Sequence, residues 1–138
     1  EYRTMPTPRQ IEDSHRLIQS PHVDLVVTHH AHVVGPVEKV GDEFVLHGLG
    51  NFLSGQVFPP ETRDGVIAVI RAKRTDGVWR FDRVEVIPTE VGGGSVITPV
   101  PRGSASWQRT MSAINAMGAE IQPFPGHVRR GARLDLWD

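Results

Sequence analysis

The sequence predicts an α/β (α+β) fold whose mixed sheet contains two antiparallel hairpins. Three observations indicate this. A predicted helix with one apolar edge leads into a short β-branched run, and two pairs of apolar segments each flank turn residues. A second segment with apolar residues at helical spacing follows. With 138 residues, 38% of them hydrophobic and 22% charged, the chain has the composition of one soluble globular unit. We therefore expect residues 1–138 to form a single domain.

The first helix is expected to begin after Thr7 and to end before Pro21. Thr7 can cap it, Pro8 suits the first helical position, and Gln10 stands where a capping box needs it. Its apolar edge is formed by Ile11, His15, Leu17 and Ile18. Its solvent side carries Arg9, Glu12, Asp13 and Arg16. A helix with such an edge needs a sheet to cover it.

A central strand covered on both faces is predicted for residues 23–27, because the run VDLVV is almost continuously apolar and β-branched. A helix followed by a buried strand is one half of a βαβ unit, whose strands are parallel. The parallel partner would then lie before residue 1. We therefore expect this chain to be the C-terminal part of a larger domain.

Two antiparallel hairpins are expected next. The first joins residues 37–40 to residues 44–46, and the second joins residues 66–73 to residues 78–87. Their turns are expected at Gly41-Asp42 and at Thr75-Asp76-Gly77. Residues 91–138 are expected to form a linker, a helix and a tail. The helical spacing in that region joins Trp107, Met111, Ile114 and Met117, with Gly118 as the C-cap.

Composition and charge exclude several classes of partner. The formal net charge is −1 and the fifteen basic residues are scattered along the sequence, which predicts no nucleic acid partner. No apolar run reaches the roughly 18 residues of a membrane span, so no transmembrane segment is expected in this chain. The absence of cysteine removes thiolate ligands, and it fits a cytoplasmic as well as an extracytoplasmic protein.

Three histidines follow the apolar run in the stretch VVTHHAH. On an extended segment, side chains two positions apart point the same way, so His30 and His32 can converge while His29 faces elsewhere. Neutral imidazole is the commonest metal ligand, and strand ends are where α/β sheets place their chemistry. The alternative is a polar loop without a ligand. Because two imidazoles make an incomplete site, the remaining ligands are expected from elsewhere.

These residues also carry a resemblance to a known family. DLVVTHHAHVVGPVE at residues 24–38, followed by FVLHGLGNF at residues 44–52, resembles the signature of the bacterial capsule-synthesis CapA family, which is linked to poly-γ-glutamate. EYRTMPTPRQ at residues 1–10 and DGVI at residues 64–67 resemble the segments on either side, so the recognisable portion is residues 1–90. The departures from the family pattern are Thr28 for glycine, Ala31 for proline and His47-Gly48 for tyrosine-serine.

The resemblance implies a calcineurin-like metallophosphatase fold, a β-sandwich flanked by helices, of which this chain is the C-terminal half. It implies two divalent metal ions, Mn, Fe, Zn or Mg, in the complete protein. His30 and His32 would be metal ligands, with His29 as the alternative. Asn51 would act as a neutral ligand or oxyanion donor, and Glu38 would orient a histidine through its free N–H. The complete protein would be a metal-dependent hydrolase or transferase, and this segment alone would be inactive.

Partners and location are implied in the same way. The N-terminal half of the domain would complete the site, the substrate would be an anionic polymer or a phosphoester, and the protein would lie at the cell envelope. An alternative function is a non-catalytic binding or assembly module for an anionic polymer such as poly-γ-glutamate, because guanidinium groups suit carboxylates. Its motivation is the scattered arginines, which make up thirteen of the fifteen basic residues and include Arg129, Arg130 and Arg133 beside His127. A third interpretation is a structural complement to the N-terminal half, without a site of its own.

Overall fold

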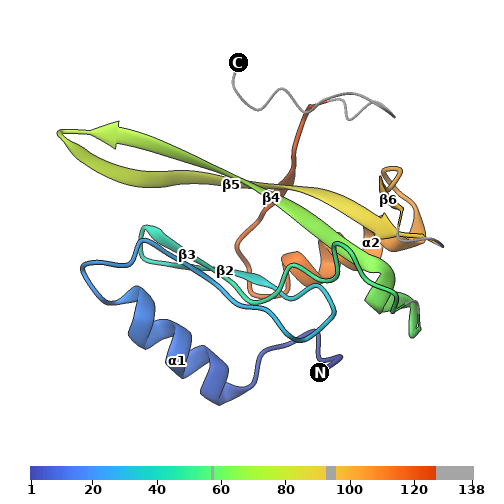
Figure 1. Ribbon diagram of the computed structural model, residues 1–138. Helices are drawn as coiled ribbons and strands as arrows, with labels where there is room; N and C mark the ends of the chain where they lie inside the picture. The colour runs from blue at the N-terminus through green and yellow to red at the C-terminus, as the bar shows by residue number, and fades with distance from the viewer. Residues whose placement is uncertain (57, 93–95, 127–138) are drawn as a thin grey trace.

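Two mixed sheets and two α-helices make up the described part of the chain, residues 1–56, 58–92 and 96–126 of this computed structural model (Figure 1). The mixed α/β architecture and both antiparallel hairpins of the sequence prediction are confirmed. None of the described helices is long and apolar enough to cross a membrane. The residues outside the described ranges include the basic tail with His127, Arg129, Arg130 and Arg133.

The smaller sheet has the strand order β1-β3-β2. Its strands are β1 (Leu25–Val27), β2 (Val37–Val40) and β3 (Glu43–Leu46). β2 and β3 form the first predicted hairpin, and β1 runs parallel to β3. The helix α1 (Pro8–Ile18) covers one face of this sheet, where Ile18 clusters with Val26 and Val45.

The larger sheet is dominated by one long hairpin. Its strands are β4 (Asp64–Thr75), β5 (Val78–Val91), β6 (Ile97–Pro99) and β7 (Gln122–Pro123). β4 and β6 pair antiparallel with β5, whereas β7 pairs parallel with it. The register of the hairpin shifts between Arg71 and Ala72, which marks a β-bulge. A 3-10 helix, η1 (Pro60–Arg63), leads into β4, and α2 (Ala105–Ile114) follows β6.

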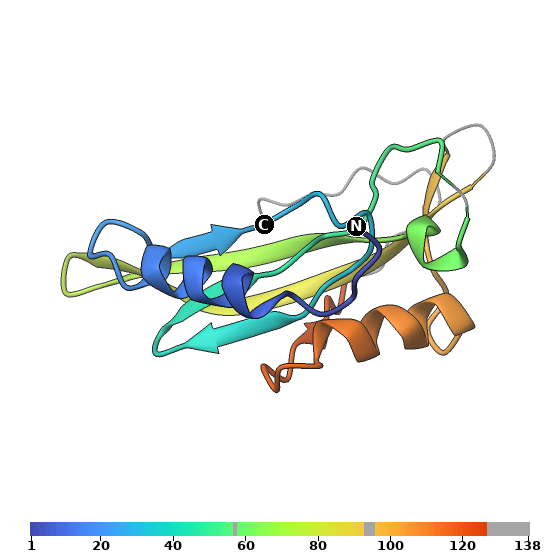
Figure 2. The same cartoon turned by 90° about the horizontal axis from the view of Figure 1, so that it is seen from below.

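The main core lies between the two sheets. The β4–β5 hairpin crosses the smaller sheet on the side away from α1, and α2 runs beside one edge (Figures 1 and 2). Both sheets, α2 and the segment after it contribute to the buried cluster of Val34, Val37, Phe44, Leu46, Val66, Val84, Val86, Met111, Ile114 and Ile121. This layered packing fixes the loops at the ends of β1 and β3, where the candidate site lies.

The helix α1 begins as its residues predict. Thr7 Oγ1 accepts a hydrogen bond from the Gln10 backbone N–H (3.3 Å), and Gln10 Oε1 accepts one from the Thr7 backbone N–H (2.8 Å), so the capping box is formed. Ser14 and Ile18 are buried, whereas Leu17 is 53% exposed. The predicted apolar edge therefore included one residue too many, because Leu17 faces solvent.

The strand predicted at residues 23–27 is shorter and more exposed than expected. Strand pairing is limited to Leu25–Val27, and among the described residues β1 lies at the edge of its sheet. Val26 is buried, but Val27 is 42% exposed. A central strand covered on both faces was therefore the wrong prediction for the described part of the chain. The parallel partner present there is β3, which follows β1 in the sequence.

The second helix ends earlier than predicted. It begins after Ser104, whose Oγ accepts a hydrogen bond from the Trp107 backbone N–H (3.2 Å), and it stops at Asn115 rather than at Gly118. At this end of the helix, the Asn115 Oδ1 accepts a hydrogen bond from the Ile121 backbone N–H (2.6 Å), and its Nδ2 donates to Met111 O (3.1 Å). These bonds turn the chain back and bury Ile121 in the core.

Candidate metal centre

The loop that follows β1 brings His30 and His32 together. Their ring centroids are 5.9 Å apart, with an angle of 51° between the ring planes. The backbone here is not the extended segment expected from the sequence, because φ is 92° at His30 and 62° at His32. Such conformations of residues other than glycine are rare, cost about 1–3 kcal/mol each and concentrate at functional sites. The imidazoles therefore converge through a turned loop, not through the alternation of a strand.

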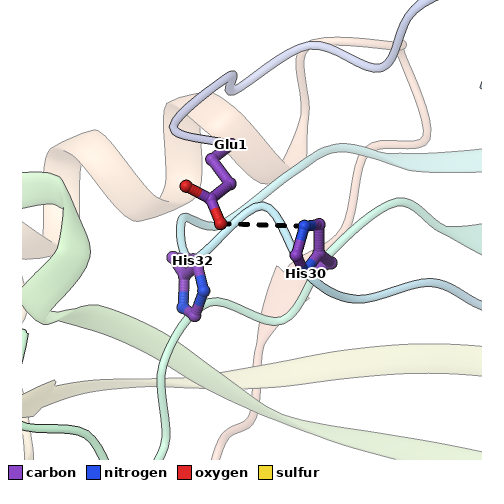
Figure 3. A group of neighbouring side chains, drawn as sticks. All are labelled: Glu1, His30 and His32. Atoms are coloured by element: carbon purple, nitrogen blue, oxygen red, sulfur yellow. Dashed lines mark ion pairs between the residues drawn. The ribbon is translucent and has the colours of Figure 1, made fainter.

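Glu1 joins these two histidines in a three-residue cluster (Figure 3). Potential ligand atoms of the three side chains all lie within 4.8 Å of one another, and Glu1 Oε1 is 3.7 Å from His30 Nε2. Glu1 is placed here by the backbone, since the N–H of Tyr2 donates to the carbonyl of Ala31 (2.8 Å). Sequence spacing did not reveal Glu1 as a candidate ligand, because a tertiary contact brings it to the histidine loop.

The tautomer of His32 is set by Asn51. His32 Nδ1 lies 3.0 Å from Asn51 Oδ1, and Asn51 Nδ2 donates to the carbonyl oxygen of Thr62 (2.9 Å). Because that carbonyl can only accept, the amide oxygen of Asn51 faces His32, and His32 Nδ1 must carry the proton. The Nε2 lone pair of His32 is then free to bind a metal ion, as in other metal sites where a neighbour fixes the tautomer.

Asn51 itself is held against β4 by two glycines in close contact. Gly50 forms an isolated β-bridge with Gly65, and a Cβ atom on Gly50 would lie 2.3 Å from the backbone oxygen of Asp64. Gly50 also has a φ of 71°, which a residue with a side chain adopts only under strain. The Gly-Asn-Phe loop seen in the sequence thus has a physical role: its glycine lets Asn51 approach both His32 and Thr62.

His29 lies outside the three-residue cluster. It lines an adjoining open pocket of about 410 Å³ together with Glu1, Arg3 and His30. His29 and His30 are both exposed, so their imidazoles are accessible to solvent. The pocket is thus lined by the guanidinium of Arg3, by the accessible imidazoles of His29 and His30, and by the carboxylate of Glu1. An anionic group could be bound there without crossing a buried region.

Glu38 is placed beside two other histidines. Its Oε1 lies 2.8 Å from His15 Nε2, and its Oε2 lies 3.1 Å from His47 Nε2. The side chain of His47 is 1% exposed and that of Glu38 is 16% exposed, so the imidazole of this pair is buried and the carboxylate is partly so. Glu38 therefore ties α1 to the end of β3, and its hydrogen bonds do not reach His30 or His32. The expected role of Glu38, orienting a histidine of the metal site, stays a prediction, because its hydrogen bonds here are to His15 and His47.

The donor set of the cluster fits a divalent transition-metal ion. Two imidazoles and one carboxylate are common zinc, manganese and iron ligands, bound at about 2.0–2.2 Å. Ligand atoms around one tetrahedral ion then lie about 3.4 Å apart, so movements of about one ångström would bring side-chain atoms that are within 4.8 Å of one another onto the same ion. Glu1 and His30 are exposed and free to make them. The fold and this loop define the chain as a mixed α/β domain with a candidate metal centre.

Comparison with known proteins shows which family the segment containing this loop resembles. Residues 1–56 match the model of the family described as bacterial capsule synthesis protein PGA_cap. The chain is also 32% identical over 101 residues to the PGA biosynthesis protein CapA of Bacillus subtilis (strain 168). The aligned region covers 73% of this chain and 24% of that protein. The chain thus spans about a quarter of the length of this relative. The resemblance to the bacterial capsule-synthesis CapA family is therefore confirmed over part of the chain: residues 1–56, which contain all three clustered side chains, match that family.

Proposed function

We propose that the protein acts in poly-γ-glutamate capsule biosynthesis at the cell envelope, as a metal-dependent hydrolase or transferase of the calcineurin-like metallophosphatase type. The observation that carries this proposal is the convergence of Glu1, His30 and His32 within 4.8 Å. The family match over residues 1–56 supports it, because that segment contains all three side chains. The remaining ligands of a two-metal site would come from the N-terminal half of the domain.

When bound, two divalent ions at such a site supply an activated water and polarise a phosphoryl or acyl oxygen. The residues of this chain would hold and orient that centre. His30 and His32 would supply imidazole nitrogens as ligands, and Glu1 would add a carboxylate that balances positive charge. Asn51 acts as a positioning residue, because its oxygen is already engaged by His32 Nδ1. The two nitrogen donors favour zinc, manganese or iron over magnesium, which prefers oxygen ligands.

The substrate proposed for this site is an anionic polymer or a phosphoester. The adjoining pocket supports this assignment, because Arg3 and His29 line it next to Glu1 and His30. A guanidinium binds carboxylate and phosphate oxygens through paired hydrogen bonds. An anion held by Arg3 would lie in the same pocket as Glu1 and His30.

Metal-dependent hydrolysis of a model phosphodiester by the complete protein tests the proposed activity. We expect turnover that a chelator abolishes and Mn²⁺ or Zn²⁺ restores. His32→Ala should lower kcat/KM at least about 100-fold, whereas His22→Ala, a control at an exposed histidine outside the cluster and its pocket, should lower it less than about tenfold. Turnover that persists in excess chelator, or an equal loss in both variants, would contradict the proposal.

A second candidate function is binding of the anionic polymer without turnover. The observation that favours it is the group of basic side chains that the fold gathers on the β4–β5 hairpin. The two candidates differ in their dependence on metal: a binding module would retain the polymer in chelator and would hydrolyse neither a phosphodiester nor the polymer.

A further inference from the structure

The far end of the β4–β5 hairpin projects beyond the smaller sheet as a two-stranded ribbon (Figure 1). We call residues 71–83 the basic hairpin tip. All of its residues are exposed except Phe81, which is half-buried. The basic residues of the tip are Arg71, Lys73, Arg74, Arg80 and Arg83, against the acidic residues Asp76 and Asp82. The fold thus gathers a third of the basic residues of a chain whose formal net charge is −1.

Like charges face each other across this ribbon. In the register of the hairpin, Lys73 is directly opposite Arg80, and Arg71 is directly opposite Arg83. Directly opposed like charges destabilise a strand pair, so this pairing is not explained by stability of the hairpin. Glu85 offsets the repulsion between Arg71 and Arg83, whereas for Lys73 and Arg80 an external anion would neutralise the ribbon.

Internal partners neutralise only part of this charge. Arg71 Nε and Arg83 Nη1 lie 3.5 and 3.7 Å from the carboxylate of Glu85, whose side chain is 5% exposed. Arg80 Nη1 lies 3.6 Å from Asp42 Oδ2, an exposed and weak pairing. Among the described residues, Lys73 has no ion pair within 4 Å. The guanidinium groups of Arg71, Arg80 and Arg83 remain more than half exposed.

An exposed aromatic side chain accompanies these charges. Trp79 is 61% exposed, its neighbour Val78 is 54% exposed, and Trp79 stands opposite Arg74 in the register. Indole and valine side chains on a solvated ribbon give a partner with methylene groups an apolar surface to contact. The tip therefore offers both cationic and apolar contacts within a few residues.

We propose that the basic hairpin tip is a docking surface for a flexible polycarboxylate chain, poly-γ-glutamate. This deepens the proposed function and rests on it for the identity of the polymer. Each repeat unit of that chain carries one carboxylate and two methylene groups, which match the guanidinium groups and Trp79 respectively. A nucleic acid duplex fits less well, because Asp76 stands at the turn that would enter a groove and would meet phosphates there.

Binding of poly-γ-glutamate to the complete protein, measured in chelator at several salt concentrations, tests this surface. The decisive variant is Lys73→Glu, which places a carboxylate opposite Arg80 and replaces a like-charged pair with an attractive one. We expect Lys73→Glu to weaken polymer binding about tenfold and to flatten its salt dependence, with a Tm equal to or above that of the unchanged protein. The matched control is Arg9→Glu on α1, where the side chain is 90% exposed and the charge change is identical.

This experiment tests the basic hairpin tip independently of the metal centre, because the chelator removes any bound metal ions. Weakened binding in Lys73→Glu with unchanged binding in Arg9→Glu supports docking at the tip. Equal weakening in both variants would reduce the interaction to net charge and overturn the proposal. Unchanged binding in Lys73→Glu, or duplex DNA bound as tightly and with the same dependence on Lys73, would overturn it as well.

Discussion

The Nδ1 atom of His32 lies 3.0 Å from the Oδ1 atom of Asn51, and the amide nitrogen of Asn51 lies 2.9 Å from the carbonyl oxygen of Thr62. This chain of hydrogen bonds connects the histidine loop to η1. It leaves one orientation for the amide and one tautomer for the imidazole. The tautomer of His32 therefore depends on a residue nineteen positions away.

Substitutions of Asn51 should separate tautomer control from fold stability. Asn51→Leu removes the acceptor for His32 Nδ1–H and should weaken metal affinity about 10–100-fold. Asn51→Asp keeps the acceptor but places a carboxylate oxygen against Thr62 O, so metal affinity should be retained while the free energy of unfolding falls by about 1–3 kcal/mol. Metal titration followed by thermal unfolding measures both. Equal metal affinity in Asn51→Leu and the unchanged protein would contradict the role of Asn51.

The contact between Gly50 and β4 should be intolerant of a single methyl group. In Gly50→Ala the new Cβ would meet Asp64 O at 2.3 Å and the residue would keep a φ of 71°. We expect a loss of about 3 kcal/mol or more in the free energy of unfolding, together with weaker metal binding, because Asn51 moves with the backbone. Gly77→Ala is the control: its φ is 83° but no atom lies within 4 Å of its Cβ, so only about 1–2 kcal/mol should be lost and metal binding should be kept. Similar losses in both variants would show that the clash at Gly50 is unimportant.

Glu38 should matter for stability more than for metal binding. Glu38→Gln leaves one acceptor for two imidazoles, one of them on the buried His47. The free energy of unfolding should fall by about 1–3 kcal/mol, with the metal content unchanged. Glu12→Gln, which breaks the exposed pair with Arg16, should cost less than about 1 kcal/mol. Loss of metal in Glu38→Gln at unchanged stability would instead place Glu38 in the metal centre.

Local chemistry made part of this fold predictable. The capping box at Thr7 and the turn at residues 75–77 involve residues within a few positions of one another, so their sequence was enough. The convergence of His30 and His32 was predicted on the wrong physical basis, an extended segment, whereas two positive φ angles produce it. The approach of Glu1 and the partners of Glu38 depend on packing between distant segments. The periodicity of apolar residues along a sequence does not reveal such contacts.

Glu43 gives the fold a pH dependence of known sign. Burial, with smaller contributions from Asp24 and Asp42, raises the pKa of Glu43 above its usual 4.5. A carboxyl group whose pKa is higher in the folded state than in the unfolded chain binds its proton more tightly when folded, so its contribution to stability decreases as pH rises above about 4.5. Glu43→Gln should therefore raise Tm at pH 7 and lose this advantage near pH 4. An advantage that is the same at both pH values would contradict the assignment.

The metal content of the purified complete protein tests the central claim most directly, with His32→Ala and His29→Ala measured in parallel after equilibration with Zn²⁺ or Mn²⁺. His32 lies in the cluster with Glu1 and His30, whereas His29 does not. We predict that His32→Ala lowers the bound metal by at least one ion per chain and that His29→Ala leaves it unchanged. Equal metal content in His32→Ala and the unchanged protein would contradict the assignment of this loop as a metal centre.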